Sequence, residues 1–106
     1  SSDLFCPEIR TGVLEGGQKV TLKEGETFTL YIEECVGNEK GCSITYPGLA
    51  KDVKKGDKIL IDDGLIELEV QATKKDSIVC LIENGGELGE KKGINVPNVK
   101  INYRKR

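Results

Sequence analysis

The sequence contains no histidine, no tryptophan and no methionine, and its aromatic residues are three tyrosines and two phenylalanines. Histidine is the side chain whose unperturbed pKa lies near neutrality, so a pH switch in that range would require a shifted group. A core without tryptophan or methionine has to be built from valine, isoleucine and leucine. This composition favours a thin β-barrel or β-sandwich.

Long apolar runs and a large excess of one charge are also missing. No run approaches the roughly 18 residues of a membrane span, and the N-terminus lacks the basic-then-apolar plan of a signal peptide. The net charge is -2 with both signs mixed throughout, which argues against binding to nucleic acid. The basic residues 104–106 are too few to reverse this. We therefore expect a soluble, untargeted chain, a single domain over residues 1–106, that binds neither membranes nor nucleic acid.

The four cysteines leave their redox state open. No CxxC spacing is present, which excludes the usual thiolate metal sites. Cys35 and Cys42 flank a glycine-rich turn and could form a disulfide if their strands meet, whereas Cys6 and Cys80 have no partner nearby in sequence. Reduced thiols are the expectation for a cytosolic protein, and Cys80, within an apolar strand, is expected in the core.

Alternating apolar and polar residues predict strands over most of the chain. Residues Gln18–Leu22 and Thr27–Ile32 are predicted to form a hairpin around a Glu-Gly turn. Residues Lys58–Ile61 and Leu65–Val70 are predicted to form a second hairpin. Its turn is Asp62-Asp63-Gly64, where glycine accepts a positive φ at no steric cost.

Further extended segments follow toward the C-terminus, and one short helical turn is expected near the middle of the chain. The strands are Ser77–Ile82, Ile94–Val96 and Val99–Tyr103, and the helical turn is Leu49–Val53. Thirteen glycines suit the sharp bends between such short strands. The predicted fold is all-β: a small closed β-barrel of short antiparallel strands with a short helical turn.

Three charged positions are candidates for binding an anion or its metal. The Lys91-Lys92-Gly93 sequence lies in a glycine-rich loop that could present ammonium and backbone N–H groups to an anion, although such charges are often merely solvated. Arg10 could hold a phosphate with two hydrogen bonds, although a single arginine is often a surface residue. Asp62 and Asp63 precede a glycine, where aspartate is also common for turn formation alone.

Three segments of the sequence, PEIRTG at Pro7–Gly12, IDDGLIELEV at Ile61–Val70 and the stretch Glu83–Asn102, resemble the mobile lid, or B domain, of pyruvate kinase. The resemblance runs in order from about Pro7 to Asn102. It implies a β-barrel that closes over phosphoenolpyruvate and ADP during phosphoryl transfer in glycolysis. It also implies that Arg10, Asp63 and Lys92 face the nucleotide phosphates and their Mg²⁺.

The two ends of the chain depart from the family pattern. Asp3 stands where the family has a potassium ligand, but Leu4 replaces the threonine whose hydroxyl would complete that site. The resemblance implies that the parent family uses magnesium and potassium. Because the potassium site is incomplete here, we expect no metal site in this chain alone. Residues 1–6 and 103–106 are the altered ends.

Two interpretations of function follow. The first is an excised and engineered lid, catalytically inert without the rest of the parent enzyme, that serves as a scaffold or binds a protein through Leu4 and Phe5 with Tyr103 nearby. The second is a lid fragment that keeps a weak site for Mg-ADP or Mg-ATP. An enzyme in its own right is not expected, because no serine or cysteine has a plausible base beside it.

Overall fold

The computed structural model describes residues 9–46 and 48–96 of the chain. Nearly all of its regular elements are strands. In chain order they are β1 (Ile9–Arg10), the 3₁₀ turn η1 (Glu15–Gly17), β2 (Val20–Leu22), β3 (Thr27–Tyr31), β4 (Gly41–Ser43), α1 (Leu49–Asp52), β5 (Lys58–Ile61), β6 (Ile66–Thr73), β7 (Ser77–Asn84), β8 (Gly86–Leu88) and β9 (Gly93–Asn95).

The longest strands follow directly from the alternation in the sequence. In β6 the side chains of Ile66, Leu68 and Val70 are buried, while the polar residues between them are half-exposed. Successive side chains of a strand point to opposite faces, so this pattern gives β6 one face for the core and one for solvent. The turn at residues 62–65 joins β5 to β6 as the predicted hairpin, with Leu60 opposite Glu67.

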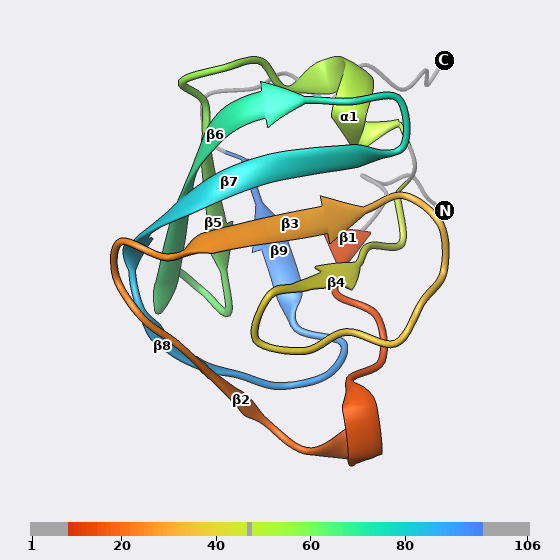
Figure 1. Ribbon diagram of the computed structural model, residues 1–106, viewed down its shortest axis with the longest axis vertical. Helices are drawn as coiled ribbons and strands as arrows, with labels where there is room; N and C mark the ends of the chain where they lie inside the picture. Colours follow the sequence, from red (N-terminus) through yellow and green to blue (C-terminus); the bar gives the residue numbers. More distant parts are fainter. Residues whose placement is uncertain (1–8, 47, 97–106) are drawn as a thin grey trace, which may run out of the picture.

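Seven strands form one sheet that curls round on itself. Their order is β1-β9-β5-β6-β7-β3-β4, so β1 and β4 are the two edges. The edges meet through a bridge between Thr11 and Ile44, where Gly12 N–H donates to the Ser43 carbonyl at 2.8 Å. In Figure 1 β4 accordingly lies beside β1 and β9, although these strands are far apart in sequence. The predicted all-β barrel-like fold is confirmed.

One pair in this sheet runs in the opposite sense to the prediction. β3 and β4 are parallel, with Thr29 opposite Gly41 and Tyr31 opposite Ser43, whereas antiparallel pairing was expected throughout. Parallel pairing requires a connection that returns the chain to the start of the strand. Residues 32–40 supply it by looping back beside β3, which is visible as the wide loop between the two strands in Figure 1.

The first predicted hairpin is wrong, although both of its strands exist. β2 pairs with β8, with Leu22 opposite Gly86, and β3 pairs with β7, with Phe28 opposite Cys80. The turn between β2 and β3 is instead held by β7, because Gly25 N–H donates to the Ile82 carbonyl at 2.8 Å. The chain therefore turns a corner here, and β2 and β8 form a separate two-stranded ribbon below the main sheet in Figure 1.

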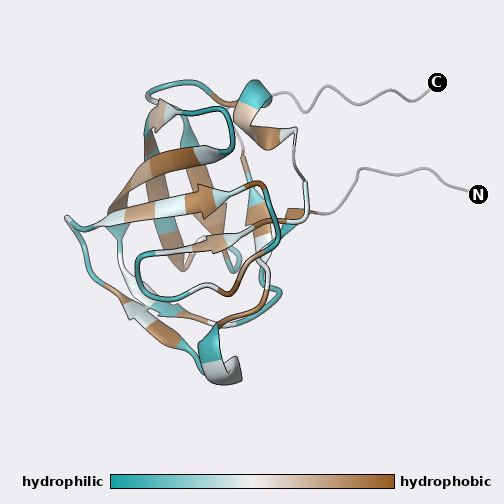
Figure 2. Cartoon of the chain, turned by 45° about the vertical axis from the view of Figure 1, so that its right-hand side comes forward, coloured by the Kyte–Doolittle hydropathy of each residue, from teal (hydrophilic) through white to brown (hydrophobic). Residues whose placement is uncertain are grey.

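The core fills the inside of the curled sheet, as the brown segments of the inner strands in Figure 2 indicate. It is built mainly from isoleucine, leucine and valine as the composition predicts, and Phe28 is the one aromatic side chain among its described buried residues. The fully buried members with the largest side chains include Phe28, Leu30, Leu49, Ile59, Ile61, Ile66, Leu68, Ile78, Ile82 and Leu88. Burial of this apolar surface is the main favourable contribution to folding.

The predicted helical turn is present as α1, at the upper end of the molecule in Figure 1. Leu49 is fully buried and anchors the turn to the core. The Tyr46 hydroxyl donates to Asp52 Oδ2 at 2.7 Å, and this hydrogen bond, with partial burial, raises the pKa of Tyr46 to about 12. No helix among residues 9–46 and 48–96 is long and apolar enough to cross a membrane. The predicted strand Val99–Tyr103 lies outside the described residues.

Candidate functional site

Arg10 occupies the outer side of β1, at the seam where the sheet closes. Ile9 before it and Thr11 after it are buried, and Arg10 itself is exposed. Its backbone N–H donates to Thr45 Oγ1 at 2.9 Å, and its carbonyl accepts from Thr45 N–H at 3.0 Å. On the other side of β1, Arg10 is the register partner of Gly93 in β9. The backbone of Arg10 is therefore fixed from both neighbouring segments.

The loop of residues 89–92 approaches Arg10 from β9. Lys92 N–H donates to Thr11 Oγ1 at 2.8 Å, and Thr11 N–H donates to the Lys92 carbonyl at 2.9 Å. Lys91 has a φ of 54°, in the left-handed region that non-glycine residues rarely adopt. The two lysines consequently sit directly beside the strand that carries Arg10.

Asp63 approaches from the opposite side of β9. It lies in the tight turn between β5 and β6, where Asp62 and Asp63 both have a positive φ, 58° and 60°. Asp62 N–H donates to the Gly93 carbonyl at 2.9 Å. Gly93 is thus held between Arg10 on one side and the aspartate turn on the other, and the three candidate segments meet on neighbouring strands.

Their side chains nevertheless open onto two separate hollows. One, of about 410 Å³, is lined by Arg10 and Lys91 over a largely apolar floor that includes Val13, Ile32 and Ile44. The other has a similar volume of about 410 Å³, and its lining includes Asp63, Gly64, Gly93 and Asn95.

Lys92 lines neither hollow. Lys92 is half-buried, and its side chain passes close over Gly89 beside Lys19. A Cβ added at Gly89 would lie only 3.0 Å from Lys92 Cε and 3.7 Å from Lys19 Cγ. The glycine-rich loop predicted both lysines as possible anion ligands and the family resemblance selected Lys92, whereas Lys91 is the lysine that shares a hollow with Arg10. The only sequence signal for Lys91 was its position in the same glycine-rich loop.

The cysteines are free thiols in the part of the chain that the structure describes. Burial raises the pKa of Cys42 to about 12, with a hydrogen bond from the Gly12 backbone acting in the opposite direction. Burial likewise raises the pKa of Cys80 to about 12, and its place in the core confirms the prediction. The Ser43 hydroxyl donates to the Cys35 carbonyl at 3.3 Å, which holds Cys35 beside β4. The disulfide between Cys35 and Cys42 that the sequence left possible is therefore not formed in this structure.

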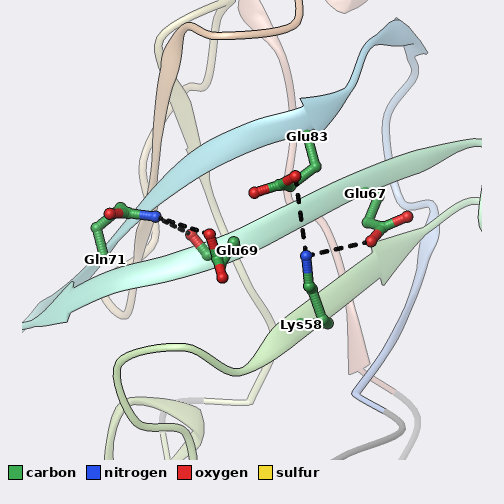
Figure 3. A network of polar contacts seen from close by, with 5 residues as sticks. All are labelled: Lys58, Glu67, Glu69, Gln71 and Glu83. Atoms are coloured by element: carbon green, nitrogen blue, oxygen red, sulfur yellow. Dashed lines mark hydrogen bonds and ion pairs between the residues drawn. The ribbon is translucent and has the colours of Figure 1, made fainter.

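A second group of charged residues lies on the outer face of β5, β6 and β7 (Figure 3). Lys58 Nζ is 3.5 Å from Glu67 Oε2 and 3.8 Å from Glu83 Oε1, and all three side chains are about one-third exposed. A hydrogen bond with Glu69 raises the pKa of Glu83, and the Lys58 ammonium acts in the opposite direction. Among residues 9–46 and 48–96 no group of three or more carboxylates or thiols is arranged to hold a metal ion. We interpret this cluster as part of the solvated face of the barrel.

Glu83→Gln should raise the melting temperature slightly near neutral pH. A carboxyl whose pKa is raised by folding binds its proton more tightly in the folded state, so its ionisation above that pKa disfavours the folded state. The gain should shrink as the pH falls toward the ordinary glutamate pKa of about 4.3, where Glu83 becomes protonated in both states. Thermal unfolding of both proteins across this range tests the sign. A lower melting temperature for the variant at neutral pH would show that the ion pair with Lys58 outweighs the effect of the neighbouring Glu69 on ionised Glu83.

Comparison with known proteins places these features in a family. Residues 1–105 match the family described as "Pyruvate kinase, barrel domain". The chain belongs to the pyruvate kinase family.

Individual pyruvate kinases match nearly the whole chain. The pyruvate kinase of Geobacillus stearothermophilus is 50% identical over 102 residues, which are 94% of this chain and 17% of that protein. The Thermotoga maritima pyruvate kinase is 46% identical over 99 residues, 93% of this chain and 21% of that protein. A crystal structure of a pyruvate kinase from Cryptosporidium parvum superposes with a TM-score of 0.89 at 39% identity, covering 92% of this chain and 20% of that one. The chain therefore spans about a fifth of the length of these pyruvate kinases.

The family assignment leaves the altered ends untested. Asp3, Leu4, Phe5 and Tyr103 lie outside the residues that the structure describes, as does Cys6. The potassium position and the protein-binding surface considered from the sequence therefore both lie outside the described residues. The hypothesis of an engineered scaffold or binding module stays a prediction.

Proposed function

We propose that this chain is the lid domain of a pyruvate kinase, inert as a catalyst by itself, and that it presents Arg10, Asp63 and the lysines 91–92 to the phosphates of Mg-ADP or Mg-ATP. The observation that carries the proposal is the meeting of three segments at Gly93. Arg10 is the β1 partner of Gly93, and Asp62, next to Asp63, donates to the Gly93 carbonyl. Charges of both signs, from β1, the 89–92 loop and the turn between β5 and β6, thereby gather along one rim of the barrel.

The cations of this rim suit a phosphoryl group. Phosphoryl transfer requires little covalent chemistry from the protein, and catalysis rests on positioning, stabilisation of developing negative charge and exclusion of water. The Arg10 guanidinium can bind two phosphate oxygens at once, whereas a lysine ammonium acts as a point charge. Arg10 and Lys91 line the same hollow and would approach one phosphate chain together. Lys92 would add positive charge from the adjacent position of the loop.

The carboxylate of the rim fits a metal that arrives with the nucleotide. Magnesium keeps several water ligands and is usually bound through one or two carboxylates together with substrate phosphates. Asp63 is exposed and lies in the hollow next to Gly93, so it would contact the metal or its bound water. The metal, when bound, neutralises phosphate charge. A single exposed carboxylate would not hold the ion without the nucleotide, so the metal would arrive with the nucleotide and would not reside in the lid.

The described residues also support a lid that is inert alone. The Ser43 hydroxyl is directed to the Cys35 carbonyl, and the buried thiols of Cys42 and Cys80 have pKa values of about 12, far above the range of a reactive thiolate. No histidine is present to act as a base. Substrate binding and transfer of the phosphoryl group would depend on the remainder of a complete pyruvate kinase.

A ¹H–¹⁵N spectrum of the chain, titrated with millimolar Mg-ADP, tests this proposal. The expected result is a set of shifts confined to Arg10, Asp63 and residues 89–93. Arg10→Ala should weaken the response about tenfold or more, because a charge-assisted hydrogen bond to phosphate is lost. Lys74→Ala, which removes an exposed cation outside the rim, should leave it unchanged.

Adenosine without phosphate is the matched ligand control. Shifts of equal size with adenosine would show that the rim does not recognise phosphate. A well-dispersed spectrum that does not respond to Mg-ADP at all would reject the nucleotide site in the isolated chain.

A further inference from the structure

We propose that Thr11 and Glu90 are positioning residues that tie the ends and the middle of the 89–92 loop to the segment that directly follows β1, residues 11–14, and so fix Lys91 and Lys92 relative to Arg10. The proposal rests on the phosphate-facing role proposed for this rim. Neither residue would touch the nucleotide. Their effect would pass through the backbone of the loop.

Thr11 makes the first tie. Its side chain is fully buried, and it is one of only three buried polar or charged residues among those described. Its hydroxyl oxygen accepts from Lys92 N–H at 2.8 Å, and its hydroxyl lies 3.4 Å from the Gly89 carbonyl, to which it donates a longer bond. A buried polar group that lacks a partner is costly, so a hydroxyl at this position and these loop atoms stabilise one another. One side chain thus spans both ends of the four-residue loop.

Glu90 makes the second tie. Its Oε2 accepts from Leu14 N–H at 2.8 Å, across 76 positions of sequence. Leu14 is buried and bridges to Gly37, so the segment that follows β1 is itself anchored. Hydrogen bonds from a backbone N–H to a carboxylate are stronger than neutral ones. The middle of the loop is therefore fastened to the same chain segment as its ends.

The loop needs such ties because of its backbone conformation. Lys91 lies in the left-handed region at a φ of 54°, without the freedom of glycine. A residue in that region persists only where its surroundings hold it there. The two ties flank Lys91 directly, at Glu90 and at Lys92. Their loss would let the loop move away from Arg10.

Hydrogen exchange of single amides tests the ties without any ligand. In Thr11→Val the Lys92 amide should lose about tenfold in protection relative to the Cys80 amide of the core, because its acceptor is gone. Thr11→Ser keeps the hydroxyl and should restore the protection. Ile78→Val, a core change on β7 away from the loop, controls for general destabilisation. A Lys92 amide that stays as protected in Thr11→Val as in the wild type would overturn the proposal.

Glu90→Ala provides a second test that leaves the core intact, since Glu90 is only half-buried. It should lower the protection of the Leu14 amide and shift the resonances of Lys91 and Lys92. If Thr11→Val does not fold, this variant alone decides the proposal. Unchanged Leu14 exchange together with unmoved lysine resonances would overturn it.

Titration with Mg-pyrophosphate then separates the ties from the phosphate site. The expected result is wild-type affinity in Thr11→Ser and a several-fold weaker response of the Arg10 and Lys91 amides in Thr11→Val. Equal affinity in Thr11→Val, despite lost protection at Lys92, would show that the ties do not position the lysines and would reject the inference. A wild-type protein that ignores pyrophosphate would reject the phosphate site, while the exchange data would still decide whether the ties exist.

Discussion

Replacing Phe28 with alanine should lower the free energy of unfolding by about 3–5 kcal/mol. Phe28 is fully buried in β3, opposite Cys80 of β7, and is the one aromatic side chain among the buried core residues that the structure describes. Its removal loses the burial of an aromatic ring and leaves a cavity that the curled sheet fills only in part. Domains of this kind have a total stability of roughly 5–15 kcal/mol, so the variant should be close to unfolding. Urea denaturation followed by far-ultraviolet circular dichroism measures the loss in a protein without tryptophan.

Tyr31→Ala is the matched control on the same strand. Tyr31 is also aromatic, but the residue is 40% exposed. It lies on the face of β3 opposite to the one that carries Phe28 and Leu30 into the core. The expected loss is below about 1 kcal/mol, as for most surface substitutions. Equal losses in the two variants would contradict the assignment of the two faces of β3, because a shift of one residue in register exchanges them.

The sequence predicted the strands more reliably than their partners. Alternation located β5, β6 and β7 because each has one buried and one solvated face, and the Asp-Gly pair predicted the turn that joins β5 to β6. The pairing of β2 was wrong because the Glu24-Gly25 turn is also compatible with a corner between two sheets. What decides between the two is a long-range contact with β7, in which Gly25 N–H reaches the Ile82 carbonyl. Local turn chemistry contains no information about that contact.

The candidate site shows a similar division. The residue types and the segments could be predicted, because arginine, a lysine-rich glycine loop and a turn aspartate are suited to phosphate and its metal. Their convergence at Gly93 could not, because it depends on the order β1-β9-β5, in which β9 lies between two strands that precede it by many residues. Thr11 was also beyond prediction. A threonine between Arg10 and Gly12 has the same appearance in sequence whether its hydroxyl faces solvent or fastens a loop 81 residues away.

Gly41→Ala should lower the free energy of unfolding by about 1–3 kcal/mol or more, although it adds only one methyl group. Gly41 begins β4 opposite Thr29 of β3, and an added Cβ would collide with the Thr29 carbonyl oxygen, while Tyr31 Cε2 would lie at 2.9 Å. A backbone carbonyl cannot move aside as a flexible side chain can. The parallel β3–β4 pair would therefore have to separate, and with it the Thr11–Ile44 bridge that closes the barrel.

Gly93→Ala is the control, since Gly93 also begins a strand of the same sheet, β9. A Cβ there would meet nothing within 4 Å, and the residue has no positive φ. Alanine at such a position reduces the conformational entropy of the unfolded chain, so stability should stay the same or rise by up to about 1 kcal/mol. Denaturant midpoints of the two variants decide the matter. If Gly41→Ala unfolded at the same midpoint as Gly93→Ala, the close approach of β4 to β3 would be wrong. The parallel pairing of β3 and β4 thus requires glycine at position 41 because of a carbonyl oxygen in β3, and the bridge that closes the barrel depends on that pairing.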